Sequence, residues 1–207
     1  MQNIIFDVDG TLWDSTEVVA KAWNRAISEV GGTDIIITSS VLKKEFGKTM
    51  EEIADDLFPH AGKEKRELIL KKCCKYEHSA LVENTDNLLF PDVKETVIKL
   101  SERCRLFIVS NCQSGYIELF MKKAGIEKYI TDYECFGNTG KGKGENIMLV
   151  MKRNHLDHVV YIGDTQGDYE ATVFAGVPFV FAKYGFGSVE NCYLAINDIA
   201  ELLDLYH

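Results

Sequence analysis

Short apolar runs alternate with helical patterns along the C-terminal part of the chain, from Leu88 onward. Strand–helix alternation of this kind is typical of βαβ units, whose strands pair in parallel. A further apolar run, Ile4-Ile5-Phe6, predicts a buried strand at the N-terminus. We therefore predict an α/β fold around a parallel sheet, with the other strands at residues 105–110, 131–136, 158–162 and 178–182.

Residues 14–85 have a different pattern. Apolar residues recur there at helical spacing, and the one strand-like run is the brief Ile35-Ile36-Ile37. Ser15 is a candidate N-cap of the first helix, which Gly31-Gly32 would end. The sheet is thus interrupted by a helical insertion, with further helices predicted at residues 39–46, 49–57 and 63–82.

Two aspartates, Asp7 and Asp9, directly follow the first strand. The carboxyl ends of strands are where α/β sheets bind ligands. The two side chains converge only if the chain turns after Val8, and Gly10 permits such a turn. Neighbouring carboxylates repel, so a cation is the usual reason to keep both ionised, while one attacks an electrophile and the other moves a proton. An ordinary Asp-Gly turn is the alternative.

Two other strands end in polar residues. Phe107–Val109 leads into Ser110-Asn111, and the strand at 158–162 leads into a segment that holds Asp164 and Asp168. Between them, a glycine-rich loop at 140–144 carries two lysines and opens a helical pattern. Asp164 and Asp168 could alternatively cap the helix that follows them.

Taken in order, the Asp pair, the serine, the loop lysine and the second Asp pair resemble the four signature motifs of the haloacid dehalogenase-like hydrolase superfamily. The resemblance covers essentially the whole chain, and is closest to the branch with phosphoglycolate phosphatase and β-phosphoglucomutase. The first motif, DVDGTLWDS, is highly specific, and GDTQGD is moderately so. The resemblance implies a Rossmann-like core of residues 1–13 and 86–207 with a small helical cap of residues 14–85.

The resemblance also implies roles for the aspartates. Asp7 would be the nucleophile and form an aspartyl-phosphate. Asp9 would protonate the leaving oxygen, deprotonate the hydrolytic water and lend its backbone carbonyl to a metal ion. Asp164 would bind that ion directly, and Asp168 would bind it or hold a water or the lysine. Oxygen ligands of this kind suit Mg²⁺.

The remaining groups would hold the phosphoryl group. Ser110 and the backbone N–H of Asn111 would donate hydrogen bonds to it, and Gly10 and Thr11 would add backbone donors. Relatives often read Lys-Pro-x-Pro at the lysine motif. Lys143 fits that place best, although the prolines are absent, and Lys141 is the alternative.

A loop in the insertion, Glu45-Phe46-Gly47-Lys48-Thr49, resembles the loop that relatives extend toward the substrate. Gly47 lets the backbone approach a ligand, and Lys48 could meet a second anionic group. A plain turn between helices with a surface lysine is an equal alternative. Trp13 would line the hinge or the pocket, or belong to the core.

Composition excludes several function classes. The net charge is −9, which gives no general affinity for nucleic acid or anionic membranes. We expect no targeting segment and no membrane span. The six cysteines contain no CxxC pair, which fits a reducing cytoplasm better than a zinc site, and Cys112 is open to interpretation as a reactive thiol. The oligomeric state is not specified.

These patterns predict a cytoplasmic, Mg²⁺-dependent phosphatase that acts on a small phosphorylated metabolite. Phosphoglycolate is the leading named substrate, closely followed by a sugar or nucleoside monophosphate. A β-phosphoglucomutase-like phosphomutase is the first alternative. A phosphonate hydrolase would use Lys48 to form an imine, but the presence of Asp9 argues against it. A non-catalytic sensor of phospho-ligands is the rival from another class.

Overall fold

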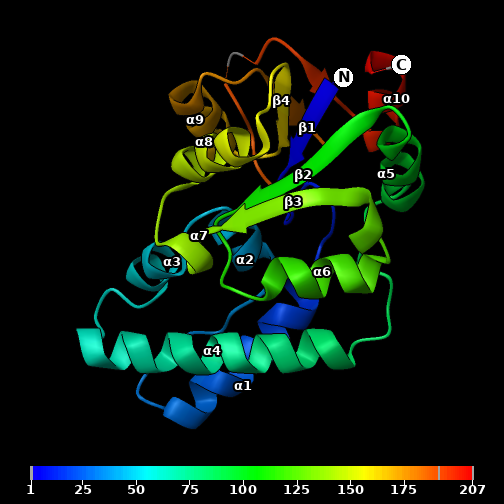
Figure 1. The fold of residues 1–207 in the computed structure, drawn as a ribbon. Coiled ribbons are helices and arrows are strands. Elements are labelled where there is room, and N and C mark those ends of the chain that lie inside the picture. Colours follow the sequence, from blue (N-terminus) through cyan, green and yellow to red (C-terminus); the bar gives the residue numbers. More distant parts are fainter. Residues whose placement is uncertain (1, 191, 207) are drawn as a thin grey trace.

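The computed structural model describes residues 2–190 and 192–206 and has a six-stranded sheet at its centre (Figure 1). The strands pair in parallel in the order β3-β2-β1-β4-β5-β6, so β1 lies between β2 and β4. This confirms the predicted α/β class. The bounds are β1 Gln2–Phe6, β2 Cys104–Ser110, β3 Ile130–Cys135, β4 Val159–Gly163, β5 Phe179–Ala182 and β6 Ala195–Ile196.

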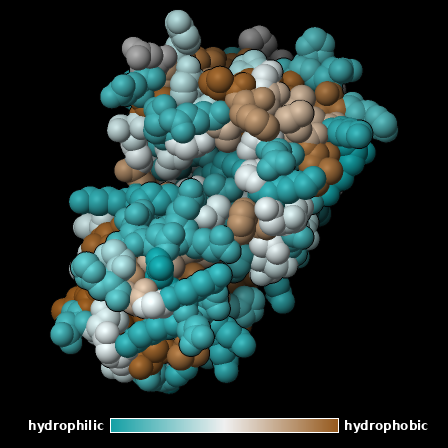
Figure 2. Space-filling model, turned by 90° about the vertical axis from the view of Figure 1, so that its left-hand side faces the viewer, coloured by the Kyte–Doolittle hydropathy of each residue, from teal (hydrophilic) through white to brown (hydrophobic). Residues whose placement is uncertain are grey.

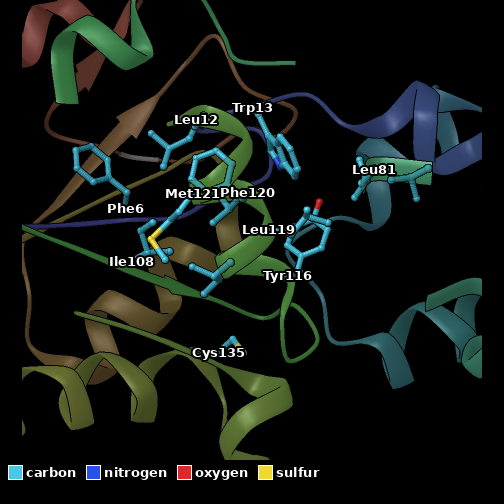
Figure 3. Packing of buried hydrophobic residues seen from close by; sticks show 14 of the residues in the cluster. Phe6, Leu12, Trp13, Leu81, Ile108, Tyr116, Leu119, Phe120, Met121 and Cys135 are labelled. Atoms are coloured by element: carbon cyan, nitrogen blue, oxygen red, sulfur yellow. The ribbon is translucent and has the colours of Figure 1, made fainter. Parts of the chain in front are cut away.

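Helices cover both faces of the sheet because successive strand residues point to opposite sides. Ile4 and Phe6 pack with α5 and α6 on one face, whereas Ile5 packs with α8 and α9 on the other. Figure 3 shows the first of these clusters, which includes Phe120 of α6. The helices are α5 Val93–Ser101, α6 Tyr116–Ala124, α7 Phe136–Thr139, α8 Lys143–Asn154, α9 Gln166–Ala175 and α10 Leu202–Leu205, with 3₁₀ turns at Glu127–Tyr129 and Ile199–Glu201.

The insertion forms a separate helical layer. Figure 1 shows α1 and α4 side by side, on the side of the sheet toward which β1 runs. Trp13, at the exit from the core, pairs with Leu89, at the return. Figure 2 shows two lobes, with largely hydrophilic side chains over the lower, helical one. The four helices of the insertion are α1 Thr16–Val30, α2 Ser39–Glu45, α3 Met50–Leu57 and α4 Lys63–Glu83.

The structure differs from the sequence patterns at three points. Ile35–Ile37 is not a strand, because the side chain of Asn24 hydrogen-bonds both the N–H and the carbonyl of Ile37. Ser15 occupies the predicted N-cap position of α1, but its side chain makes no capping hydrogen bond, and the N–H of Thr16 donates to Asp14 Oδ1 instead. The sequence also did not indicate β6 or α7. Within the described ranges, no helix has the length and apolar character that a bilayer span requires.

Candidate active site

Three buried carboxylates meet at the carboxyl ends of two neighbouring central strands. Asp7 directly follows β1, Asp164 follows β4, and Asp168 lies in the first turn of α9. One oxygen of each carboxylate lies within 4.8 Å of the others. The side chains are 0–1 % exposed. The strand order therefore brings together aspartates that are far apart in the sequence.

One lysine enters this cluster. Lys143 is the first residue of α8 and is 4 % exposed. Its Nζ lies 3.2 Å from Asp7 Oδ1 and 2.5 Å from Asp168 Oδ1. Lys141 is exposed. Burial alone would lower the pKa of Lys143, but the attraction of Asp168 and Asp7 outweighs it and raises that pKa, so the ammonium stays charged.

Asp168 serves both the helix and the lysine. Its Oδ2 accepts hydrogen bonds from the backbone N–H of Thr165 and from the Thr165 hydroxyl, which closes a capping box at the start of α9. Its Oδ1 accepts from Lys143 and, at 3.3 Å, from Tyr161. With donors on both oxygens, Asp168 is better placed to hold the lysine than to bind a cation directly.

The Asp164 carboxylate is hydrogen-bonded on both oxygens and closely packed against the backbone. Its Oδ1 accepts from the Thr11 hydroxyl at 3.2 Å, and its Oδ2 accepts from the Phe186 N–H at 2.7 Å. Gly10 has a φ of +82°, and a Cβ there would lie 2.2 Å from Asp164 Oδ2. Glycine is therefore required at this turn both for its backbone conformation and for the space it leaves.

Asp9 accepts hydrogen bonds from a different set of donors than Asp7, Asp164 and Asp168 do. Its Oδ1 accepts from Tyr116 at 2.7 Å, from Trp13 Nε1 at 3.0 Å and from the Ser15 hydroxyl at 3.2 Å. Trp13 and Tyr116 pack edge to face, as Figure 3 shows. Trp13 is therefore a buried residue that orients a site carboxylate, and Ser15 has this role rather than the predicted capping role.

The carboxylates carry more negative charge than the lysine offsets. Burial raises the pKa of Asp7 to about 6 and that of Asp9 to about 7. It also raises the pKa of Asp164 well above its usual range, with repulsion from Asp168 and Asp7 adding to the effect. Such a site lowers its free energy by taking up a cation. Oxygen ligands and excess negative charge fit a divalent ion such as Mg²⁺.

A cavity opens beside Asp9 between the core and the insertion. Ser110 and Asn111, at the end of β2, line it. Cys112 lines it too, and burial raises its thiol pKa well above the ordinary value. A raised pKa leaves little thiolate, so the structure argues against Cys112 as a reactive thiol.

The predicted loop of the insertion reaches this cavity. Gly47 has a φ of +94°, and its carbonyl accepts a hydrogen bond from Asn111 Nδ2 at 2.9 Å. Lys48 also lines the cavity, but its ammonium lies 2.8 Å from Glu45 and 2.7 Å from Asp56. The loop thus contacts the core at the site, while its lysine is already paired with two carboxylates.

Sequence reasoning missed three buried polar residues of the site. Tyr161 stands within an apolar strand, and Tyr116 begins a largely apolar helix, so neither gave a signal. Glu77, in contrast, does give a signal in the sequence. The buried residues of α4 are Ile69, Cys73, Glu77 and Leu81, which repeat every four positions and so place a carboxylate on an apolar face.

Comparisons with known proteins identify the family and agree with the fold. A family model described as haloacid dehalogenase-like hydrolase matches residues 4–182. A phosphoglycolate phosphatase of Shigella boydii is 26% identical over 245 residues, covering 100% of this chain and 94% of that protein. A structure described as a predicted phosphoglycolate phosphatase from Haemophilus somnus superposes with a TM-score of 0.86 at 19% identity, covering 100% and 98% of the two chains. A haloacid dehalogenase-like family hydrolase from Streptococcus pneumoniae gives 0.85 at 18%, covering 100% and 99%.

Proposed function

Because the chain belongs to the haloacid dehalogenase-like hydrolase family, we propose that it is a phosphatase that hydrolyses small phosphomonoesters through an aspartyl-phosphate on Asp7. The observation that carries the proposal is the contact of Lys143 with Asp7 and Asp168 beside Asp164. A buried nucleophile, a buried ammonium and an excess of carboxylate form a site for an anionic group that arrives with a divalent cation.

Asp7 would attack phosphorus, and the alcohol oxygen of the ester would leave with the electron pair of its bond. Lys143 keeps this carboxylate available, since its attraction opposes the effect of burial on the pKa of Asp7. The Ser110 hydroxyl and the backbone N–H of Asn111 would hydrogen-bond the transferring phosphoryl oxygens.

Asp9 would move the protons. It would protonate the departing alcohol and later take a proton from the water that attacks the aspartyl-phosphate, which releases phosphate and restores Asp7. A pKa of about 7 suits both directions near neutral pH. Tyr116, Trp13 and Ser15 would fix its orientation.

The cation would be held by Asp7, Asp164 and the backbone carbonyl of Asp9. Mg²⁺ is our choice, and when bound it would offset the negative charge of the site and of the transferring group. Asp168 completes the acidic cluster, and its hydrogen bonds favour holding Lys143 over direct ligation.

The insertion, residues 14–85, would act as a cap over the site. Its Gly47 loop contacts Asn111 of the core, which would shield the aspartyl-phosphate from bulk water and shape the space for the leaving alcohol. The names of the relatives make phosphoglycolate one ester to test.

The direct test is turnover of an aryl phosphate with Mg²⁺ and with EDTA. We expect release of inorganic phosphate with Mg²⁺, and loss of activity with EDTA that added Mg²⁺ restores. Isomerisation of a sugar phosphate without release of phosphate would point to a phosphomutase instead. Binding of phosphate esters without turnover would point to a sensor.

A further inference from the structure

Glu77 is a buried carboxylate on the inner face of the cap, and the proposed chemistry does not use it. It lies on α4, is 3 % exposed and lines the cavity beside Asp9. Its Oε2 accepts from Trp23 Nε1 at 2.7 Å within the cap, and its Oε1 accepts from Gln113 Nε2 of the core, also at 2.7 Å. The carboxylate therefore spans the boundary between cap and core at the site.

Both partners of Glu77 are neutral donors. Among the described residues, no Lys or Arg forms an ion pair with it. Each carboxylate oxygen can accept more than one hydrogen bond, so Glu77 keeps capacity for a donor from a ligand. A buried carboxylate with two neutral partners gains most from a hydroxyl or an ammonium group brought into the cavity.

Asn111 provides a second acceptor. Its Nδ2 donates to the carbonyl of Gly47, and a carbonyl can only accept, so the amide orientation is fixed. Asn111 Oδ1 is then buried and without a hydrogen-bond partner. A buried, unpaired acceptor costs free energy that a donor on the ligand would recover.

The lining of the cavity is unfavourable for an anionic group. Of the described residues that line it, Lys48 alone is a lysine or arginine, and Glu45 and Asp56 already hold its ammonium. The Asp and Glu residues in the lining are Asp9 and Glu77. A carboxylate on the leaving alcohol would meet two carboxyl groups of the protein there and no free cation.

We propose that Glu77, with Asn111 Oδ1, selects phosphomonoesters whose leaving alcohol carries a hydroxyl or ammonium donor and no negative charge. This inference rests on the proposed phosphatase function and narrows it to polyol and amino-alcohol phosphates. Phosphoglycolate, whose leaving group carries a carboxylate, is then a poor substrate for this chain.

The test is a panel of small esters that differ in one group. With Mg²⁺ present, kcat/KM is measured for 2-hydroxyethyl phosphate, phosphoethanolamine, glycerol phosphate and phosphoglycolate, with an aryl phosphate as the reference for basic activity. We expect the best donor-bearing ester to exceed phosphoglycolate by about tenfold or more, which is ~1.4 kcal/mol in transition-state binding. The better of the hydroxyl and ammonium esters identifies the preferred donor.

Glu77→Gln removes the negative charge and keeps one acceptor oxygen. It should bring the ratio between the best ester and phosphoglycolate to within about threefold, mainly by raising kcat/KM for phosphoglycolate. The matched control is Glu83→Gln, the same change at an exposed position on the same helix, which should leave the ratio as in the wild type.

Two results would overturn the inference while leaving the phosphatase proposal intact. One is aryl phosphate turnover with phosphoglycolate as the best of the four esters. The other is an unchanged ratio in a folded Glu77→Gln variant. If that variant does not fold, the wild-type ratio alone decides. If no ester is hydrolysed, the proposed function itself fails and the inference fails with it.

Discussion

At the scale of single residues, the structure distinguishes Lys143 from Lys141, the two lysines that the sequence offered for the same role. Lys143 begins α8, so the helix holds its side chain against Asp7 and Asp168. Lys141 stands between two glycines and is exposed. A charge held by a regular element in a buried site can act on a reacting group, whereas a solvated loop charge is screened.

Lys143→Ala should therefore reduce kcat by on the order of 100-fold or more, about 2.7 kcal/mol of lost charge stabilisation. Lys141→Ala should change kcat far less. Steady-state kinetics of both variants on an aryl phosphate provide the comparison. If Lys141→Ala is the damaging change, the role given to Lys143 is wrong.

At the scale of elements, α4 carries an ionisable group where a helix normally buries an apolar one. Glu77 lies between Cys73 and Leu81 on its buried face. Burial raises the pKa of Glu77 to about 7 from an ordinary value of 4.5, and the hydrogen bonds from Gln113 and Trp23 oppose that effect only in part. We therefore expect the ionisation of Glu77 to contribute to the pH dependence of stability.

This pKa shift predicts the direction of a stability change. As pH rises from about 4.5 to about 7, the unfolded chain loses the proton of Glu77 before the folded protein does, so ionisation favours unfolding. Glu77→Gln cannot ionise. Its free energy of unfolding, relative to wild type, should rise by about 2–3 kcal/mol between pH 5 and pH 8.

Urea unfolding of both proteins at the two pH values, without added metal, measures this difference. Glu83→Gln is again the control, since an exposed carboxylate should contribute little. A constant difference between wild type and Glu77→Gln at both pH values would show that Glu77 keeps an ordinary pKa.

At the scale of the whole molecule, the topology brings the site together. β1 and β4 are neighbours in the sheet, so Asp7 and Asp164 meet although more than half the chain separates them. The insertion adds Gly47 and Glu77 to the lining of the cavity beside Asp9. The sheet and the insertion must therefore both fold for the cavity to exist.

Much of this was predictable from the sequence because the strand-end residues follow clear apolar runs. Asp7 and Ser110 each stand directly after one, and Asp164 follows one with only Gly163 between. Contacts that depend on tertiary structure were not predictable. Ile35–Ile37 has strand-like composition, but the Asn24 side chain satisfies the backbone of Ile37, and β6 is only two residues long.

Binding of a divalent cation should stabilise the whole fold, because it offsets charges that are buried only in the folded state. We expect Mg²⁺ at about 100 times its Kd to add ~2.7 kcal/mol to the free energy of unfolding, and so to raise Tm. Asp164→Asn should lose most of that increase. The measurement is thermal unfolding of both proteins with Mg²⁺ and with EDTA, and an equal increase in both would remove Asp164 from the metal site.

The most direct test of the account is the activity of Asp7→Asn. The amide keeps the shape of the side chain and removes the nucleophile, so we predict a folded protein whose turnover of an aryl phosphate with Mg²⁺ falls by more than about 1,000-fold. Circular dichroism would confirm that the variant is folded. Turnover within about tenfold of wild type, a barrier change of only ~1.4 kcal/mol, would contradict the assignment of Asp7 as the residue that forms the covalent intermediate.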